Sequence, residues 1–88
     1  MDFKDLKYFI AVYEARGFSR ASENLGTVQS NVSARILNLE ESLGGALFER
    51  QWRRVVPTEK GEKFYTHAKE TLAALDDTAR RFKLPSTV

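Results

Sequence analysis

The feature that most constrains the fold is a long stretch without proline near the end of the chain. Between Thr58 and about Lys83 there is no proline, and Gly61 is the only glycine. Apolar residues recur there at gaps of four and three, close to a heptad pattern: Phe64, Ala68, Leu72, Leu75, Ala79 and Phe82. A helix of this length would span roughly 37 Å, more than a core made by residues 1–57 can cover. We therefore expect the stripe to form a homodimer seam, with coverage of the same chain's body as the alternative.

The length and composition exclude several classes of protein. The chain has 88 residues and no cysteine, so it has room for one modest core and cannot form disulfides or thiolate zinc sites. The N-terminus lacks a signal-peptide pattern, and no apolar run approaches the roughly 18 residues of a membrane span. His67 is the only histidine, and it has no second ligand in view. We expect a cytoplasmic domain with no metal, no cofactor in this chain and no membrane partner.

Three shorter helices are predicted before the long one. The first has an apolar stripe at helical spacing, made by Phe3, Leu6, Phe9, Ile10 and Tyr13. Gly17 is its expected stop, and Ser19 is the expected N-cap of a second helix that ends near Gly26. Thr27 is the expected N-cap of the third helix, which ends at Gly44. The third helix has the most regular stripe in the chain: Val32, Ile36, Leu39 and Leu43.

A short hairpin is predicted between the third helix and the long one. Leu47-Phe48 and Val55-Val56 read as two short strands, and Pro57 closes the second because it cannot donate to a ladder. The charged turn between them holds the densest basic cluster of the chain, namely Arg50, Arg53 and Arg54 around Trp52. Thr58 then caps the long helix.

Two helices joined by a tight turn and followed by such a hairpin are typical of a winged helix-turn-helix. We predict a mainly α fold with three helices and a two-stranded β wing over residues 1–58. The helix-turn-helix would occupy about 18–37 and the wing about 46–57. A linker helix for dimerisation would follow over 59–84, and residues 85–88 would begin a hinge.

The third helix has a polar face that suits DNA. Its core stripe turns other side chains outward: Ser30, Ala34, Leu37 and Asn38, flanked by Gln29, Asn31, Ser33 and Arg35. The major groove accepts one α-helix, where Gln and Asn pair with adenine and Arg with guanine. This pattern predicts that the third helix reads double-stranded DNA.

The ordered motifs resemble those of the LysR-type transcriptional regulators. They include Phe18-Ser19-Arg20-Ala21-Ser22, Gln29-Ser30-Asn31-Val32-Ser33, Leu39-Glu40, Leu43-Gly44, Leu47-Phe48-Glu49-Arg50 and Pro57-Thr58-Glu59-Lys60-Gly61. The resemblance runs from about Met1 to Phe82. It implies a bacterial transcription factor that binds promoter DNA as a dimer or tetramer. It also implies that the chain is a fragment, whose small-molecule effector would bind an absent C-terminal domain.

The resemblance assigns roles to individual residues. Base readout falls to Gln29, Ser30, Ser33 and Ala34, with Asn31, Arg35 and Asn38 beside them. Phosphate or wing contacts fall to Ser19, Arg20, Thr27, Arg50, Trp52, Arg53 and Arg54. The chain departs from the family pattern at Ser30, often proline, at Ala34, often a long polar residue, at Leu37, often basic, and at Trp52, often glycine. These departures leave the fold prediction unchanged, but the base preference of the family does not carry over to this chain.

Other interpretations stay open at this point. Arg35 could pair with Glu23 or Glu40 at the surface, and Trp52 could pack on the base of the wing instead of on a sugar. The whole domain could dock a protein instead of DNA. An enzyme is disfavoured, because the sequence shows no nucleophile with a base, no metal cluster and no phosphate-binding glycine loop.

Overall fold

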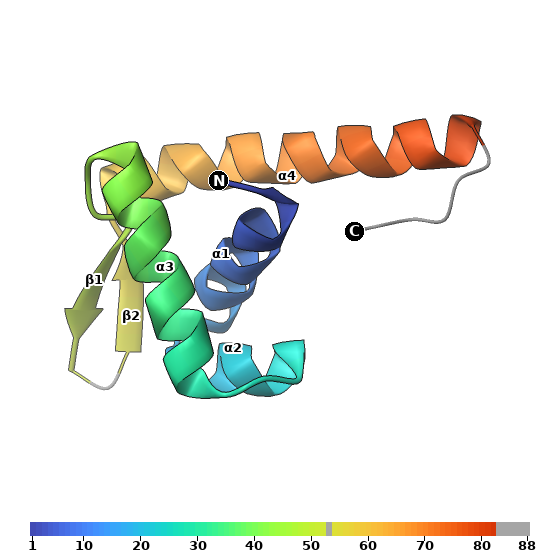
Figure 1. Cartoon of the computed structure of the whole chain (residues 1–88). Coiled ribbons are helices and arrows are strands. Elements are labelled where there is room, and N and C mark those ends of the chain that lie inside the picture. The colour runs from blue at the N-terminus through green and yellow to red at the C-terminus, as the bar shows by residue number, and fades with distance from the viewer. Residues whose placement is uncertain (53, 83–88) are drawn as a thin grey trace.

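The computed structural model describes residues 1–52 and 54–82. The elements in chain order are α1 (Phe3–Ala15), α2 (Phe18–Leu25), α3 (Gln29–Leu43), β1 (Phe48–Gln51), β2 (Arg54–Pro57) and α4 (Glu59–Arg81). Helices α1, α2 and α3 pack together on one side of the long α4, and the hairpin β1–β2 lies beside α3 (Figure 1). The predicted mainly α winged helix-turn-helix is confirmed. Arg53 and the predicted hinge at 85–88 lie outside the described residues.

The turn between α1 and α2 differs from the prediction by a residue or two at each helix end. Helix α1 ends at Ala15, and Arg16 takes the left-handed conformation (φ 56°), so Gly17 is not the stop. Gly17 is instead the N-cap of α2 in an extended conformation. Ser19 therefore lies inside α2, where its carbonyl accepts the Ser22 hydroxyl at 2.6 Å. An arginine in the left-handed region is uncommon, because its Cβ crowds the backbone there.

The start of α3 also differs from the prediction, whereas the ends of α2 and α3 agree with it. Gly26 and Gly44 end α2 and α3 in the left-handed conformation that glycine adopts without a Cβ clash. Thr27 is not the N-cap of α3; Val28 is, with no side-chain capping bond. The Thr27 hydroxyl is one residue too early and accepts the side-chain N–H of Asn31 at 3.0 Å.

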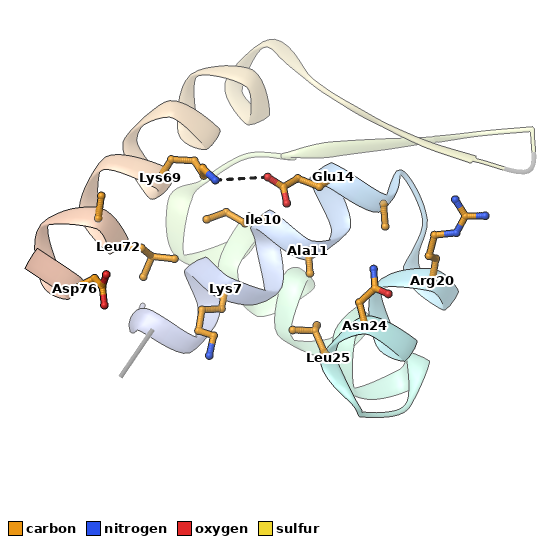
Figure 2. A pocket seen from close by; sticks show the side chains of 12 residues that line it. Lys7, Ile10, Ala11, Glu14, Arg20, Asn24, Leu25, Lys69, Leu72 and Asp76 are labelled. Carbon is orange, nitrogen blue, oxygen red and sulfur yellow. Dashed lines mark ion pairs between the residues drawn. The ribbon is translucent and has the colours of Figure 1, made fainter. Parts of the chain in front are cut away.

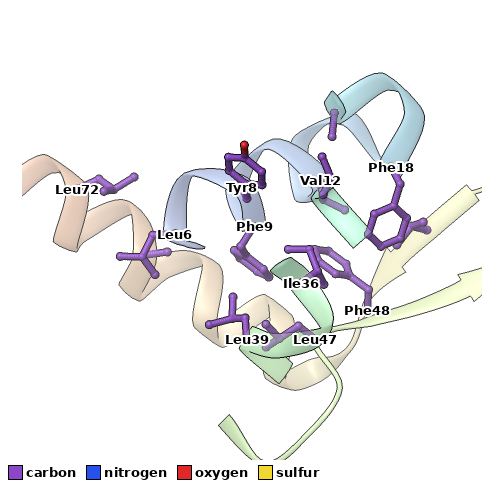
Figure 3. Packing of buried hydrophobic residues seen from close by; sticks show 14 residues of the cluster. Leu6, Tyr8, Phe9, Val12, Phe18, Ile36, Leu39, Leu47, Phe48 and Leu72 are labelled. Atoms are coloured by element: carbon purple, nitrogen blue, oxygen red, sulfur yellow. The ribbon is translucent and has the colours of Figure 1, made fainter. Parts of the chain in front are cut away.

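The core forms where α1 meets α3, the hairpin and the first half of α4 (Figure 3). Phe9 is fully buried at its centre, with its ring 5.1 Å from Phe48 and 4.9 Å from Phe64. The stripe predicted for α3 is buried at Val32, Ile36 and Leu39, and its last member, Leu43, is partly buried against the same core. This packing orients α3 with its opposite face outward.

The wing is an antiparallel hairpin in which Arg50 pairs with Val55 and Gln51 with Arg54. Strand β1 extends to Gln51, into residues expected to form the turn. Hydrogen bonds to α3 and to the α1–α2 turn attach the hairpin to the helices. The Glu40 carboxylate accepts the backbone N–H of Leu47 at 2.7 Å, and the Val55 N–H donates to the Arg16 carbonyl at 3.2 Å.

Thr58 is the N-cap of helix α4, as predicted. The Thr58 hydroxyl oxygen accepts the backbone N–H of Gly61 at 3.0 Å and donates to the Ala46 carbonyl at 2.7 Å. Gly61 is buried, and a Cβ there would collide with the Leu47 carbonyl oxygen. The N-terminal end of α4 is thus locked against the base of the wing.

The apolar stripe of α4 lies in two different environments along the helix. Phe64, Ala68 and Leu72 pack into the core of their own chain. For these three residues the structure favours the alternative given above, coverage by the same chain's body, because α1 lies against this half of the helix. The remaining members are Leu75, which is half-buried, Ala79, which is buried outside the core cluster, and Phe82, which is 72% exposed. This second half extends beyond the three-helix body (Figure 1).

Candidate nucleic-acid interface

The outward face of α3 carries the residues predicted to read bases. Gln29, Ser30, Asn31, Ala34 and Asn38 are exposed, and Ser33 is half-buried. Burial of Val32, Ile36 and Leu39 sets this orientation, because the opposite face of a helix must then meet solvent. The N-terminal turns of α3 therefore present a row of short polar side chains.

Arg35 is held away from this outward face. Its guanidinium lies 2.7 Å from the Asp5 carboxylate and 3.5 Å from that of Asp2, and it sits over the Tyr8 ring at 5.1 Å. Neither of the partners considered in the sequence, Glu23 or Glu40, forms these ion pairs. We therefore withdraw Arg35 from base readout, because its charge is already engaged by α1.

The partners of Arg35 also form the capping box of α1. Asp2 and Asp5 each accept the other's backbone N–H at 2.9 Å. The hydrogen bond from the Asp5 N–H lowers the pKa of the Asp2 carboxyl, and the charge of Arg35 lowers it further. The start of α1 and the middle of α3 are thus joined through the Asp2 and Asp5 carboxylates.

An arginine-lined cleft lies between the α1–α2 turn and the wing. It is an open cleft of about 520 Å³ whose basic lining residues are Arg16, Arg20, Arg50 and Arg54. Ser19 and Gln29 line it as well, so the cleft reaches the first residue of α3. The carboxylates that pair with arginines in the described part of the chain lie elsewhere, at Asp2, Asp5, Asp76 and Asp77. The arginines of the cleft can therefore meet an anion.

Aromatic rings help to position two of these arginines. The Arg50 guanidinium lies 4.5 Å from the centre of the Phe18 ring, and that of Arg16 lies 4.6 Å from the Tyr13 ring. Such stacking favours a cation and leaves its edge free for hydrogen bonds. The structure therefore brings Ser19, Arg20, Arg50 and Arg54 together, as the sequence predicts, and adds Arg16. The only sequence signal for Arg16 is its place in the turn that joins two predicted helices.

The tip of the wing is exposed. Trp52 is 84% exposed, so most of its ring faces solvent instead of packing on the base of the wing. Gln51 and Arg54 are exposed beside it, while Arg53, which the sequence also assigns to the wing, lies outside the described residues. An exposed aromatic ring at this position offers a flat surface for a sugar or a base.

A second, wider groove separates α4 from α1 and α2 (Figure 2). It has a volume of about 750 Å³, an apolar floor that includes Ile10, Leu25 and Leu72, and a rim with both positive and negative charges. Lys69 and Glu14 form an ion pair across it at 3.7 Å. Lys7, Arg20 and Asp76 line the groove as well, so its rim is charged around the apolar floor.

Two kinds of feature are missing from the described residues. Across 1–52 and 54–82, no three histidine or acidic side chains are grouped in a way that could hold a metal ion. In the same residues no helix has the length and hydropathy needed to cross a membrane.

Comparison with known proteins gives a consistent result. Residues 3–62 match the family described as bacterial regulatory helix-turn-helix protein, lysR family. The chain is 42% identical over 83 residues to the HTH-type transcriptional regulator BudR of Raoultella terrigena, covering 94% of this chain and 29% of BudR. It is 38% identical over 88 residues to the regulator BenM of Acinetobacter baylyi, covering all of this chain and 29% of BenM. The chain thus spans less than a third of the length of these relatives, which are named as regulators and not as enzymes.

Solved structures agree with the sequence matches. The DNA-binding domain of BenM in complex with benA site 1 DNA has a TM-score of 0.90 and 38% identity, with 94% of this chain and 93% of that chain covered. The complex of the CbnR DNA-binding domain with DNA has a TM-score of 0.91 and 34% identity, covering 94% and 95%. The family match covers well over half of the residues, and both folds coincide over nearly the whole domain. The chain belongs to the LysR family of bacterial transcriptional regulators and forms its helix-turn-helix DNA-binding domain.

Proposed function

We propose that this domain binds promoter DNA in a sequence-specific manner as a homodimer, in the bacterial cytoplasm. The observation that carries the proposal is the placement of the polar outward face of α3 next to the arginine-lined cleft. The major groove accepts a single helix, and phosphates flank it on both sides. A helix that can enter the major groove and a cationic cleft that can bind the flanking phosphates are therefore adjacent.

The arginine-lined cleft and the outward face of α3 would make different contacts with DNA. Contacts to phosphate fix the register of a protein on DNA, and contacts to base edges give specificity. We assign phosphate contacts to Arg16, Ser19, Arg20, Arg50 and Arg54, with Trp52 on an adjacent sugar. We assign base contacts to Gln29, Ser30, Asn31, Ser33, Ala34 and Asn38. Thr27 supports this set indirectly, because its hydroxyl accepts the Asn31 side-chain N–H.

The homodimer is proposed through the second half of α4. Leu75 and Phe82 continue the apolar stripe past the body of the domain, with the already buried Ala79 between them, and a second copy of the helix would cover the exposed part of this stripe. The similar structures in complex with DNA support the DNA partner. By the same likeness, and because the relatives are longer, we propose that effector binding and tetramer assembly belong to a further domain of the complete regulator.

The test is fluorescence anisotropy with the 88-residue chain against a random DNA library, a non-nucleic polyanion and a series of salt concentrations. Enrichment of a two-fold-related sequence, with half-sites about one helical turn or a multiple apart, would support dimeric readout. Binding to DNA and polyanion alike without enrichment would contradict sequence specificity. A stable dimer that binds no DNA would favour a protein-docking module instead.

Two substitutions separate the parts of the interface. Arg54→Ala should weaken binding to all sequences and lower the salt slope by about one, whereas Gln29→Ala should cost about 1–3 kcal/mol at one base pair and relax specificity there. Lys63→Ala is a matched control, because Lys63 is an exposed cation on α4 that pairs with Glu59 away from the cleft. Equal losses on random and selected DNA for Gln29→Ala would overturn its assignment to base readout.

A further inference from the structure

The outward face of α3 carries one large apolar side chain near the middle of the helix. Leu37 is 58% exposed, although Ile36, the residue before it, is buried in the core. Ala34 is exposed one turn earlier, and Ser30 and Ser33 complete the same face at helical spacing. We call Ser30, Ser33, Ala34 and Leu37 the outer stripe. Its members carry no charge, and Leu37 is its only long side chain.

The charged side chains nearest this stripe are directed to other elements. The Arg35 guanidinium is 2.7 Å from the Asp5 carboxylate on α1. The Glu40 carboxylate accepts the backbone N–H groups of Leu47 and Phe48, at 2.7 and 3.3 Å. Neither group is positioned to form a hydrogen bond with a ligand beside Leu37. Leu37 itself offers apolar contact, whereas the exposed Asn38 that follows it and Arg50 in the wing are the polar side chains of this region.

Leu37 also lines a small recess next to the wing. The recess has a volume of about 50 Å³, and its apolar lining residues are Phe18, Ile36, Leu37 and Phe48, with Ser33, Glu40 and Arg50 completing it. Phe18 and Phe48 are held in the core, at 7% and 9% exposure. One wall of the recess is therefore rigid, and the space suits a group of about methyl size.

Among the base edges of the major groove, the C5-methyl of thymine is the apolar group. We infer that Leu37, with Ala34 beside it, contacts a thymine methyl in each half-site and is a specificity-determining residue of α3. This inference rests on the proposed function, because α3 must enter the major groove for the contact to form. Thymine is then the base that the apolar end of the outer stripe selects.

The experiment uses the DNA sequence that the 88-residue chain selects from the random library. Each thymine of a half-site is replaced in turn by deoxyuridine, which removes the methyl and keeps every hydrogen-bonding group. At one position the replacement should weaken binding about fourfold per half-site, the fold-change expected for one buried methyl-sized group. Leu37→Ala should bind the thymine and deoxyuridine duplexes equally at that position, and Leu37→Met should retain a preference for thymine.

Val28→Ala is the matched control. Val28 is also apolar and 63% exposed, but it precedes α3 and lies outside the outer stripe. This variant should keep the preference for thymine at the position that Leu37 reads. Thermal melts of the variants should coincide with the parent chain, because both side chains are exposed.

The outcomes separate this inference from the proposed function. Sequence-specific binding that no deoxyuridine replacement weakens would overturn the inference and leave the proposed function standing. A thymine preference that survives in Leu37→Ala would also overturn the inference alone. The same holds for a preference that disappears in Val28→Ala but not in Leu37→Ala. Failure of the chain to select any DNA sequence would overturn the proposed function and the inference together.

Discussion

The two halves of α4 carry the same apolar spacing but lie in different surroundings. In the first half, Phe64, Ala68 and Leu72 are covered by the core of their own chain. In the second half, Leu75 and Phe82 extend past that core, and Phe82 is largely exposed. The difference teaches that a periodic stripe identifies which face of a helix avoids water, but not which surface will cover that face.

Different interactions hold the two halves in place. The first half is held by contacts with distant residues: the rings of Tyr13 and Tyr65 stack at 3.7 Å, and the Tyr65 hydroxyl donates to the Glu14 carboxylate at 2.6 Å. The second half has local pairs one turn apart, namely Arg80 with Asp76 and Arg81 with Asp77, each at 2.8 Å. Exposed pairs of this kind contribute only a few tenths of a kcal/mol each. The first half should therefore govern stability and the second half association.

The largest expected effect is the contrast between two leucines on the same stripe. Leu72→Ala should lower the free energy of unfolding by about 3 kcal/mol, because it removes a buried side chain and leaves a cavity. Leu75→Ala, at the half-buried start of the second half, should cost under about 1 kcal/mol. Urea denaturation at low protein concentration measures both. Equal losses of unfolding free energy for the two variants would contradict the division of α4 into a covered half and an exposed half.

The first half of α4 packs so closely on the chain before β1 that a small added group should lower stability. Gly61→Ala should destabilise the domain by about 2 kcal/mol, because the added methyl would collide with the Leu47 carbonyl. This outcome opposes helix propensity, by which alanine is favoured over glycine by about 1 kcal/mol. Gly17→Ala is the control, since nothing lies within 4 Å of a Cβ there and the backbone is extended. Denaturation midpoints should fall for the first variant and change little for the second.

A third prediction concerns the second half alone. Phe82→Ala should weaken the proposed homodimer about tenfold, because a large apolar side chain would leave the seam. The unfolding free energy of the monomer should not change. Sedimentation equilibrium over a range of concentrations measures the strength of the dimer, and denaturation at the lowest concentration measures the unfolding free energy of the monomer. A variant that dimerises as tightly as the parent would remove Phe82 from the seam.

The smallest expected effect is a dependence on alkaline pH that arises in the first half. The hydrogen bond to Glu14 raises the pKa of Tyr65 from 10.0 to about 12. Above pH 10 the unfolded chain therefore loses this proton while the folded chain keeps it. Stability from this group is fully present below pH 10 and is lost as the pH rises to about 12.

Tyr65→Phe tests this pH dependence. The variant should show a shallower fall in unfolding free energy between about pH 10 and about pH 12. It should keep a residual slope from Tyr13, whose pKa is raised by a hydrogen bond to Glu62. Urea titrations at each pH measure the slope. An unchanged slope would show that the Glu14 contact does not persist in solution.

Much of the fold follows from local patterns in the sequence. The α3 stripe predicts the face that is buried, and Gly26, Gly44 and Thr58 mark helix ends where the structure has them. The ends near Gly17, Ser19 and Thr27 were misplaced, because several adjacent residues could cap or stop a helix there equally well. Only the packing of α2 against α1 and α3 selects among them.

The interface shows the same limit. The sequence predicts Arg50 and Arg54 as members of one basic wing cluster, and the family resemblance assigns Arg20 separately to phosphate contacts. Arg16 joins them only because its left-handed turn brings α1 and the wing together. Arg35 leaves the reading face because Asp5, thirty positions away in the sequence, lies within hydrogen-bonding distance of it. Neither contact has a local signature.

The sequence by itself determined the winged helix-turn-helix, the buried and exposed faces of α3 and the length of α4. These properties depend on periodicity, glycine and capping side chains, which act over one or two turns of chain. The tertiary structure decided which half of α4 is covered, where Arg35 points and which arginines share a cleft. Those outcomes depend on contacts between residues far apart in the chain, whose geometry is set only when the core packs.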